Sequence, residues 1–170
     1  MTAIWQSPIS LLHIAAALLA LGIGTGVLIA PKGTNRHRLF GYTYVGLMLI
    51  VLTTAFNIYH LFGRFGVVHG GAVVACLALL IGVGAPVLKW PVRSWPRWHY
   101  VGMGCSVAGL YATFLVEATY RLFPPRYFWW STVGTSLVVF LISAGLLWRG
   151  YKRNGLATHH QPVLIDQLDD

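Results

Sequence analysis

The sequence predicts an all-α integral membrane protein with five transmembrane helices, four forming an up-down bundle and the fifth packing on its outside. Three observations support this fold class. The 170 residues are 56% hydrophobic and only 9% charged, a composition too apolar for folding in water. Five apolar runs reach the length of about 20 residues that a helix needs to cross the hydrocarbon. Lysine, arginine and tryptophan gather at the ends of these runs, as is typical of membrane interfaces.

The five predicted helices cover residues 8–30, 37–62, 66–88, 98–122 and 127–148. Ser7-Pro8, Thr34-Asn35 and Ser94-Trp95-Pro96 are typical helix starts, with a capping residue before the first turn. Gly63 separates the second run from the third, and Pro124-Pro125 separates the fourth from the fifth. Residues 1–153 therefore form one transmembrane domain. Residues 154–170 are polar and are expected to form a mobile cytoplasmic tail.

The distribution of cations predicts the orientation. Nine lie on one predicted side (Lys32, Arg36, Arg38, Lys89, Arg93, Arg97, Arg149, Lys152, Arg153) and three on the other (Arg64, Arg121, Arg126). The positive-inside rule then places the N-terminus outside and the C-terminus in the cytoplasm. The same placement explains the net charge of +8, so we expect contacts with membrane lipid and none with nucleic acid.

Five histidines fall into two layers of the predicted bundle. His13, His60 and His69 lie near its outer end, while His37 and His99 open the second and fourth helices at the inner end. In an up-down bundle with short loops, helices 1 and 3 form one diagonal and helices 2 and 4 the other. His13 with His69, and His37 with His99, would thus face each other across the bundle.

Facing imidazoles are what a six-coordinate haem iron requires, one on each side of the porphyrin. The sequence therefore favours up to two b-type haems, held by His13/His69 and by His37/His99. Four inner arginines could contact haem propionates or anionic lipid: Arg36, Arg38, Arg93 and Arg97. The small residues Ala17, Ala20 and Gly24 on the face below His13 could make room for a porphyrin or could form a close helix seam.

A second interpretation is a non-haem metal site at the outer end. Glu117 is the only acidic residue before the tail, and its depth matches that of His13, His60 and His69. Three imidazoles and a carboxylate could bind zinc, copper or iron and support a metal-dependent membrane hydrolase. A polar stripe is expected beside this site, made of Thr53 and Asn57 on helix 2 and Ser106 and Thr113 on helix 4. The third interpretation is a structural or accessory subunit without cofactor, in which these polar groups satisfy one another.

Several motifs resemble a bacterial family of predicted membrane proteins of unknown function. They are Leu12-His13-Ile14, the run from Lys32 to Val45 that contains His37-Arg38-Leu-Phe-Gly41, Val68-His69 and Arg97-Trp98-His99. The resemblance covers about residues 10–125 and implies one histidine in each of the first four helices. It also implies a location in the bacterial inner membrane. The histidine layout is similar to that of two-haem membrane cytochromes of the b561 type. We therefore expect a haem-binding electron-transfer protein that acts with quinone, or with a redox or oligomeric partner.

Overall fold

The structure, a computed structural model, describes residues 7–58, 66–119 and 122–153. These residues form five long helices and no strand: α1 (Pro8–Ile29), α2 (Asn35–Ala55), α3 (Val67–Leu88), α4 (Trp95–Thr119) and α5 (Phe128–Arg153), the last preceded by the short 3₁₀ helix η3 (Pro125–Tyr127). All five are long and apolar enough to cross a membrane. The predicted fold class, an all-α multi-pass membrane protein, is confirmed.

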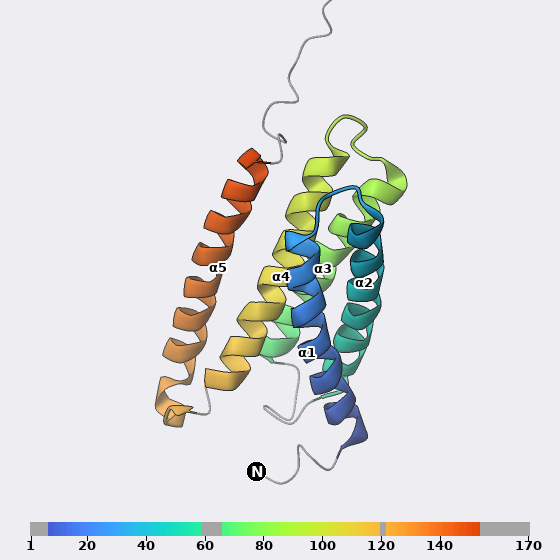
Figure 1. Cartoon of the computed structure of the whole chain (residues 1–170). Helices are drawn as coiled ribbons and strands as arrows, with labels where there is room; N and C mark the ends of the chain where they lie inside the picture. The colour runs from blue at the N-terminus through green and yellow to red at the C-terminus, as the bar shows by residue number, and fades with distance from the viewer. Residues whose placement is uncertain (1–6, 59–65, 120–121, 154–170) are drawn as a thin grey trace, which may run out of the picture.

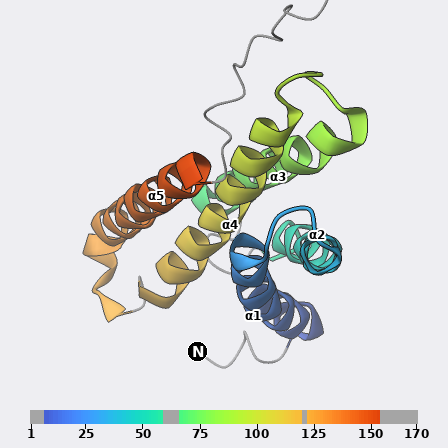
Figure 2. The ribbon, with the colours of Figure 1, turned by 45° about the horizontal axis from the view of Figure 1, so that its top comes forward.

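The first four helices form two antiparallel hairpins that pack against each other (Figures 1 and 2). The most extensive contacts join α1 to α2 and α3 to α4, while smaller contacts join α1 to α4 and α2 to α3. The pairs α1/α3 and α2/α4 are therefore the diagonals, as predicted. The fifth helix, α5, packs along α4 on the outside of the bundle, which confirms its peripheral position. We call the boundary between the α1–α2 and α3–α4 hairpins the inter-hairpin seam.

Local chemistry explains where the helices begin. Pro8 occupies the first turn of α1, where its missing N–H costs nothing. The Thr34 hydroxyl caps α2 by accepting a hydrogen bond from the His37 backbone N–H at 3.2 Å. The observed starts of the five helices lie within three residues of the predicted ones.

The predicted end of the second helix at residue 62 is wrong, because α2 ends at Ala55. The Asn57 side chain donates to the Thr53 carbonyl at 2.8 Å, where the next helical N–H would have bonded. The Asn57 and Ile58 N–H groups instead bond three residues back, to Thr54 and Ala55. At the other extreme, α5 continues to Arg153, five residues beyond its predicted end at 148.

Small residues of α1 form a close helix seam. Ala16, Ala20 and Gly24 are buried, and a Cβ atom on Gly24 would lie 2.9 Å from the Tyr44 ring of α2. The space beside Gly24 is thus filled by an aromatic side chain of the protein itself. Of the two uses considered for this face, close helix packing is the one observed.

Tyr44 also links the two hairpins. Its side chain is fully buried, and its hydroxyl lies 2.9 Å from the hydroxyl of Ser106 on α4, which is also fully buried. Thr25 of α1 and Tyr111 of α4 make a second bond across the inter-hairpin seam, at 2.6 Å between their hydroxyl oxygens. These bonds favour this register of the two hairpins, because the fully buried hydroxyls of Tyr44 and Ser106 satisfy each other in it.

A double-mutant cycle tests the Tyr44–Ser106 bond. Tyr44→Phe and Ser106→Ala are each expected to lower the free energy of unfolding by about 1 kcal/mol, since each leaves one buried hydroxyl without its partner. The double variant is expected to lose less unfolding free energy than the two single variants lose together. The difference is a coupling energy of roughly 0.6 kcal/mol. Unfolding in mixed micelles measures all three values, and additive losses would contradict the bond.

The closest approach within the second hairpin is between Gly82 of α3 and Gly102 of α4. A Cβ atom on Gly102 would lie 2.5 Å from the backbone nitrogen of Gly82 and 2.9 Å from the carbonyl oxygen of Ala78. Backbone-to-backbone packing at this point is possible only because neither residue has a side chain. It brings the start of α4, with His99, against the end of α3.

Candidate functional site

His37 and His99, the predicted inner pair, meet across the α2/α4 diagonal. The ring centroids of His37 and His99 are 6.2 Å apart, and their planes are nearly perpendicular, at 85°. His37 lies in the first turn of α2 and His99 in the second turn of α4. Two turns further along the same helices, Tyr44 and Ser106 make the second contact of this diagonal. The histidine pair therefore sits at one end of the inter-hairpin seam, above a buried polar contact.

A proline in α3 orients the His99 ring. Pro86 lies inside the helix and has no N–H, so the carbonyl of Gly82, four residues earlier, lacks its helical donor. The His99 Nδ1 lies 2.6 Å from this carbonyl oxygen and donates to it. The bond places the proton on Nδ1 and leaves the Nε2 lone pair available. Metal-ligating histidines are held in the same way, with the second ring nitrogen donating to a carbonyl.

The His37 ring contributes an unsatisfied nitrogen to the same layer. Its Nδ1 is buried and has no hydrogen-bond partner among the described residues. A buried polar atom without a hydrogen bond lowers the free energy of unfolding by about 1–3 kcal/mol. Only a group that bonded to Nδ1 itself would recover that cost.

Cations surround this end of the bundle, which we call the basic end. It carries all nine residues that the sequence assigned to one side: Lys32, Arg36, Arg38, Lys89, Arg93, Arg97, Arg149, Lys152 and Arg153. Arg36, Arg38 and Arg93 are exposed and Arg97 is half-buried. The Arg38 Nη2 donates to Asn35 Oδ1 at 2.7 Å. No acidic side chain lies at this end among the described residues, so an anionic group would be attracted there.

Lys32 closes the end of α1. Its Nζ donates to the carbonyls of Val27 and Leu28, each at 2.9 Å, which lack helical partners at the C-terminal turn. The pKa of Lys32 is lowered, first because burial removes part of the hydration of the ammonium and second because Arg153 is cationic nearby. The Lys32 ammonium therefore caps the C-terminal turn of α1.

The outer histidine of α1 is bound by a threonine that the sequence analysis did not single out. The His13 Nδ1 lies 2.8 Å from the Thr54 hydroxyl of α2. That hydroxyl also donates to the Ile50 carbonyl at 2.6 Å, so its oxygen accepts from His13. His13 thus pairs within the first hairpin.

The outer histidine of α3 has the opposite tautomer from His99. His69 is buried, and its Nδ1 accepts a hydrogen bond from the Gly66 N–H at 3.2 Å, which caps α3. The neutral ring then carries its proton on Nε2. Ligating histidines normally donate through the second nitrogen. His13 and His99 have donating Nδ1 atoms, whereas the Nδ1 of His69 accepts. Each ring of the predicted His13/His69 haem pair thus has another protein partner here.

The outer metal site has incomplete support. No group of three or more histidine, cysteine or acidic side chains lies close enough to hold one ion within residues 7–58, 66–119 and 122–153. His13, His69 and Glu117 therefore do not form such a group by themselves. His60, the fourth predicted ligand, lies outside the described residues.

The polar stripe predicted on helix 2 lies on an exposed face. Thr53 and Asn57 are exposed, and their side chains bond to backbone carbonyls of their own helix. On α4 the prediction holds better, since Ser106 is fully buried and Thr113 is half-buried. The Thr113 hydroxyl donates to the Gly109 carbonyl at 2.8 Å.

Three features that shape the histidine sites escaped the sequence analysis: Thr54, Tyr44, and the pair Gly82/Pro86. The buried face of α2 contains Tyr44, Met48 and Val51, and Thr54 continues this helical spacing. That spacing was the available signal for Thr54. The signal for the His99 acceptor was the proline inside an apolar run, since a proline four residues after Gly82 frees its carbonyl.

The chain was also compared with known proteins. The resemblance to a family of predicted membrane proteins stays a prediction, because no family model, curated protein or solved structure matches this chain.

Proposed function

We propose that this protein is an electron-transfer protein of the bacterial inner membrane that binds one b-type haem between His37 and His99. The observation that carries the proposal is the geometry of these two rings. Two metal–nitrogen bonds of about 2.0 Å, one on each side of a metal, separate opposed imidazole centroids by roughly 6 Å. The observed separation is 6.2 Å. The two rings are in edge-to-face contact here, so both would have to turn for their nitrogens to point at one iron.

The number of ligands favours haem over a bare ion. Among the described residues, the histidine layer offers two imidazoles and no third histidine, cysteine or acidic ligand. A bare zinc, copper or iron ion needs three or four protein ligands. A porphyrin supplies four nitrogens itself, so two imidazoles complete the six-coordinate set.

The residues of the layer fit such a group in three ways. His99 has the tautomer of a ligand because of the Gly82 carbonyl. His37 has a buried nitrogen that lacks a partner among the described residues. Two small buried residues lie near the depth of the histidine layer. They are Ala30, directly after α1, and Ala85, near the end of α3. The site lies in the inter-hairpin seam, where the contacts between helices are smaller than within each hairpin.

Each part of the site has a role in this function. A bound haem would supply one-electron redox chemistry. His37 and His99 would hold it from opposite hairpins, and Pro86 positions His99 through the Gly82 carbonyl. Arg36, Arg38, Arg93 and Arg97 neutralise propionate groups or bind anionic lipid. The Tyr44–Ser106 layer separates the site from the other half of the bundle. Electrons pass to or from a quinone or another redox partner, with the N-terminus outside and the C-terminus in the cytoplasm.

A visible spectrum with metal analysis tests the proposal. The full chain would be purified from cells supplied with iron and a haem precursor. We expect the reduced-minus-oxidised spectrum to show a low-spin b-type signal at about one haem per chain. A folded sample that contains no haem would overturn the proposal, and stoichiometric zinc or copper in such a sample would favour the non-haem interpretation.

Pro86→Ala tests the positioning of His99. The new N–H at residue 86 can bond to the Gly82 carbonyl and compete with His99 Nδ1. We expect haem affinity to fall by roughly 10–100-fold, as for other supports of metal ligands, and the midpoint potential to change. The thermal stability of the haem-free protein is expected to stay the same or rise, because a proline leaves the helix interior. An unchanged potential and affinity would show that the Gly82 bond does not position the ring.

A further inference from the structure

An apolar groove of about 270 Å³ follows the α3–α4 hairpin on its exposed side. Its lining comes from two helical stripes with the same spacing: Val74, Leu77, Ala78 and Ile81 on α3, and Trp98, Val101, Gly102 and Cys105 on α4. Bulky residues of both stripes are exposed, while Ala78 and Gly102 form the low floor between them. Seven residues of helix span about 10 Å, so the groove runs along the bundle axis and fits an extended chain.

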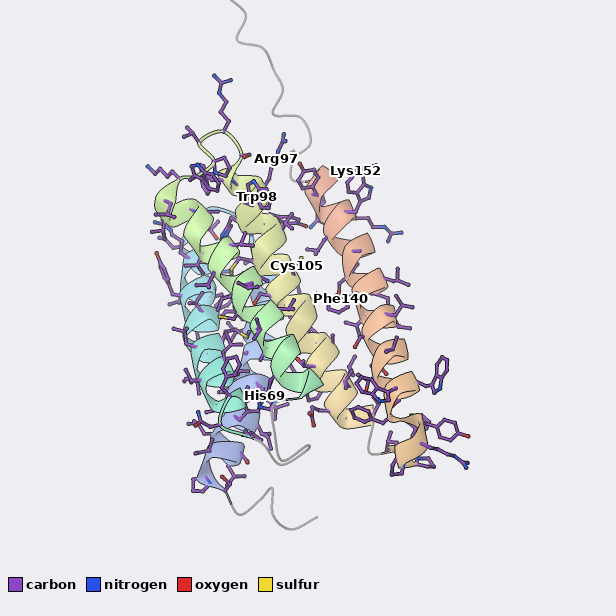
Figure 3. All side chains as sticks on the ribbon, turned by 180° about the vertical axis from the view of Figure 1, so that it is seen from behind. His69, Arg97, Trp98, Cys105, Phe140 and Lys152 are labelled. Atoms are coloured by element: carbon purple, nitrogen blue, oxygen red, sulfur yellow. The ribbon has the colours of Figure 1, made fainter. Side chains whose placement is uncertain are left out.

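The groove begins at the basic end. Trp98, at one end of the groove, is adjacent in sequence to the half-buried Arg97. Figure 3 shows Arg97 and Trp98 at the same end of the molecule as Lys152, with Cys105 farther down α4 and His69 at the opposite end. Tryptophan and arginine at this level are typical of the boundary between lipid head groups and hydrocarbon. The groove thus extends from a head-group level into the apolar part of the fold.

The positive charge near the Trp98 end of the groove favours anionic lipids over uncharged ones. Arg93 and Arg97 lie in sequence on either side of the start of α4, and no acidic side chain lies at this end among the described residues. A phosphate monoanion would be favoured here over a head group without net charge. The lining itself is almost wholly apolar, which suits an acyl chain better than a quinone ring whose carbonyl oxygens need donors.

We infer that the groove is a binding site for an anionic phospholipid. One acyl chain occupies the groove between α3 and α4, and the phosphate lies against Arg97 and Arg93. The Trp98 indole covers the point where the chain meets the head group. None of the eight lining residues belongs to the histidine layer, although Arg93 and Arg97 are also among the cations proposed to contact haem propionates.

Native mass spectrometry after reconstitution tests the site. The full chain would be placed in vesicles of equal parts phosphatidylglycerol and phosphatidylcholine, extracted in mild detergent, and its retained lipids counted. We expect phosphatidylglycerol to be retained at least fivefold more than phosphatidylcholine. Arg97→Gln is expected to lower this preference about fivefold, since one cation near the surface contributes that much.

Cys105→Phe and Ala144→Phe form a matched pair for the groove. Cys105 lines it, whereas Ala144 is an exposed residue of α5 outside it. The first variant is expected to reduce retained phosphatidylglycerol about tenfold, and the second to leave it unchanged. Equal retention of both lipids by the wild type, equal effects of the two phenylalanines, or a retained quinone in place of the lipid would each overturn the inference. Circular dichroism confirms that each variant is folded.

Discussion

Replacement of His99 by alanine is expected to abolish haem binding while the protein remains folded and inserted. The substitution would remove one of the two imidazoles proposed to hold the haem. Supports of metal ligands contribute 10–100-fold in affinity, so loss of the ligand itself is expected to exceed about 100-fold. The haem content per chain and the reduced-minus-oxidised spectrum of the purified variant measure this loss. His37→Ala is expected to have the same effect, because both sides of the porphyrin need a ligand.

His13→Ala provides the matched control. His13 is also a histidine near a helix end, but its Nδ1 is bonded to Thr54 within the first hairpin. We expect this variant to keep the haem at about the wild-type level and to lose about 1 kcal/mol of unfolding free energy with the bond. Retention of haem by His99→Ala, or equal loss in all three variants, would contradict the assignment of the site to His37 and His99.

Gly102→Ala is expected to cause the largest loss of stability of any single methyl addition considered. A Cβ atom at this position would lie 2.5 Å from the Gly82 nitrogen and 2.7 Å from the Gly82 Cα. These atoms are backbone and cannot rotate away, so α3 and α4 must move apart. Overpacking of this kind costs about 1–3 kcal/mol or more. The free energy of unfolding in mixed micelles measures the effect.

Gly84→Ala separates this steric effect from helix propensity. Gly84 lies in the same hairpin, and a Cβ atom there would meet no atom within 4 Å. Alanine is favoured over glycine in a helix by about 1 kcal/mol, so this variant is expected to be as stable as the wild type or more stable. If Gly102→Ala proved as stable as Gly84→Ala, the close approach of α3 and α4 would be wrong.

Much of the architecture follows from hydropathy. The length of the apolar runs specifies five helices, and the short connections specify which neighbours are antiparallel. From these two facts the sequence predicts that helices 2 and 4 are diagonal and that His37 and His99 meet. That prediction needs only helix order and depth, which a sequence carries directly.

Helix rotation is harder to read from this sequence. The prediction placed Thr53 and Asn57 together on one face of the second helix, and the structure shows that this face is exposed while Thr54 is buried. Apolar residues cover every side of a transmembrane helix, so polarity gives little information on which side faces the protein. Close packing of Tyr44 against Gly24 fixes the rotation of α2, and that contact depends on the shape of two helices together.

Tautomers are equally a matter of tertiary structure. His69 and His99 look alike in sequence, since each lies near the start of its helix. His69 accepts from its own N-cap, while His99 donates to a carbonyl that a proline on another helix leaves free. Only the packing of α4 on α3 creates that acceptor. The sequence therefore identifies four candidate histidines, and the structure adds the hydrogen bonds that three of their Nδ1 atoms make.

Electron paramagnetic resonance of the oxidised protein tests the central claim most directly. A haem iron held by His37 and His99 would carry two imidazole ligands, which favour the low-spin ferric state. We therefore expect a low-spin signal, absent from the His37→Ala and His99→Ala variants and present in His13→Ala. A high-spin signal alone, or a folded protein supplied with haem that gives no haem signal, would contradict the proposed site.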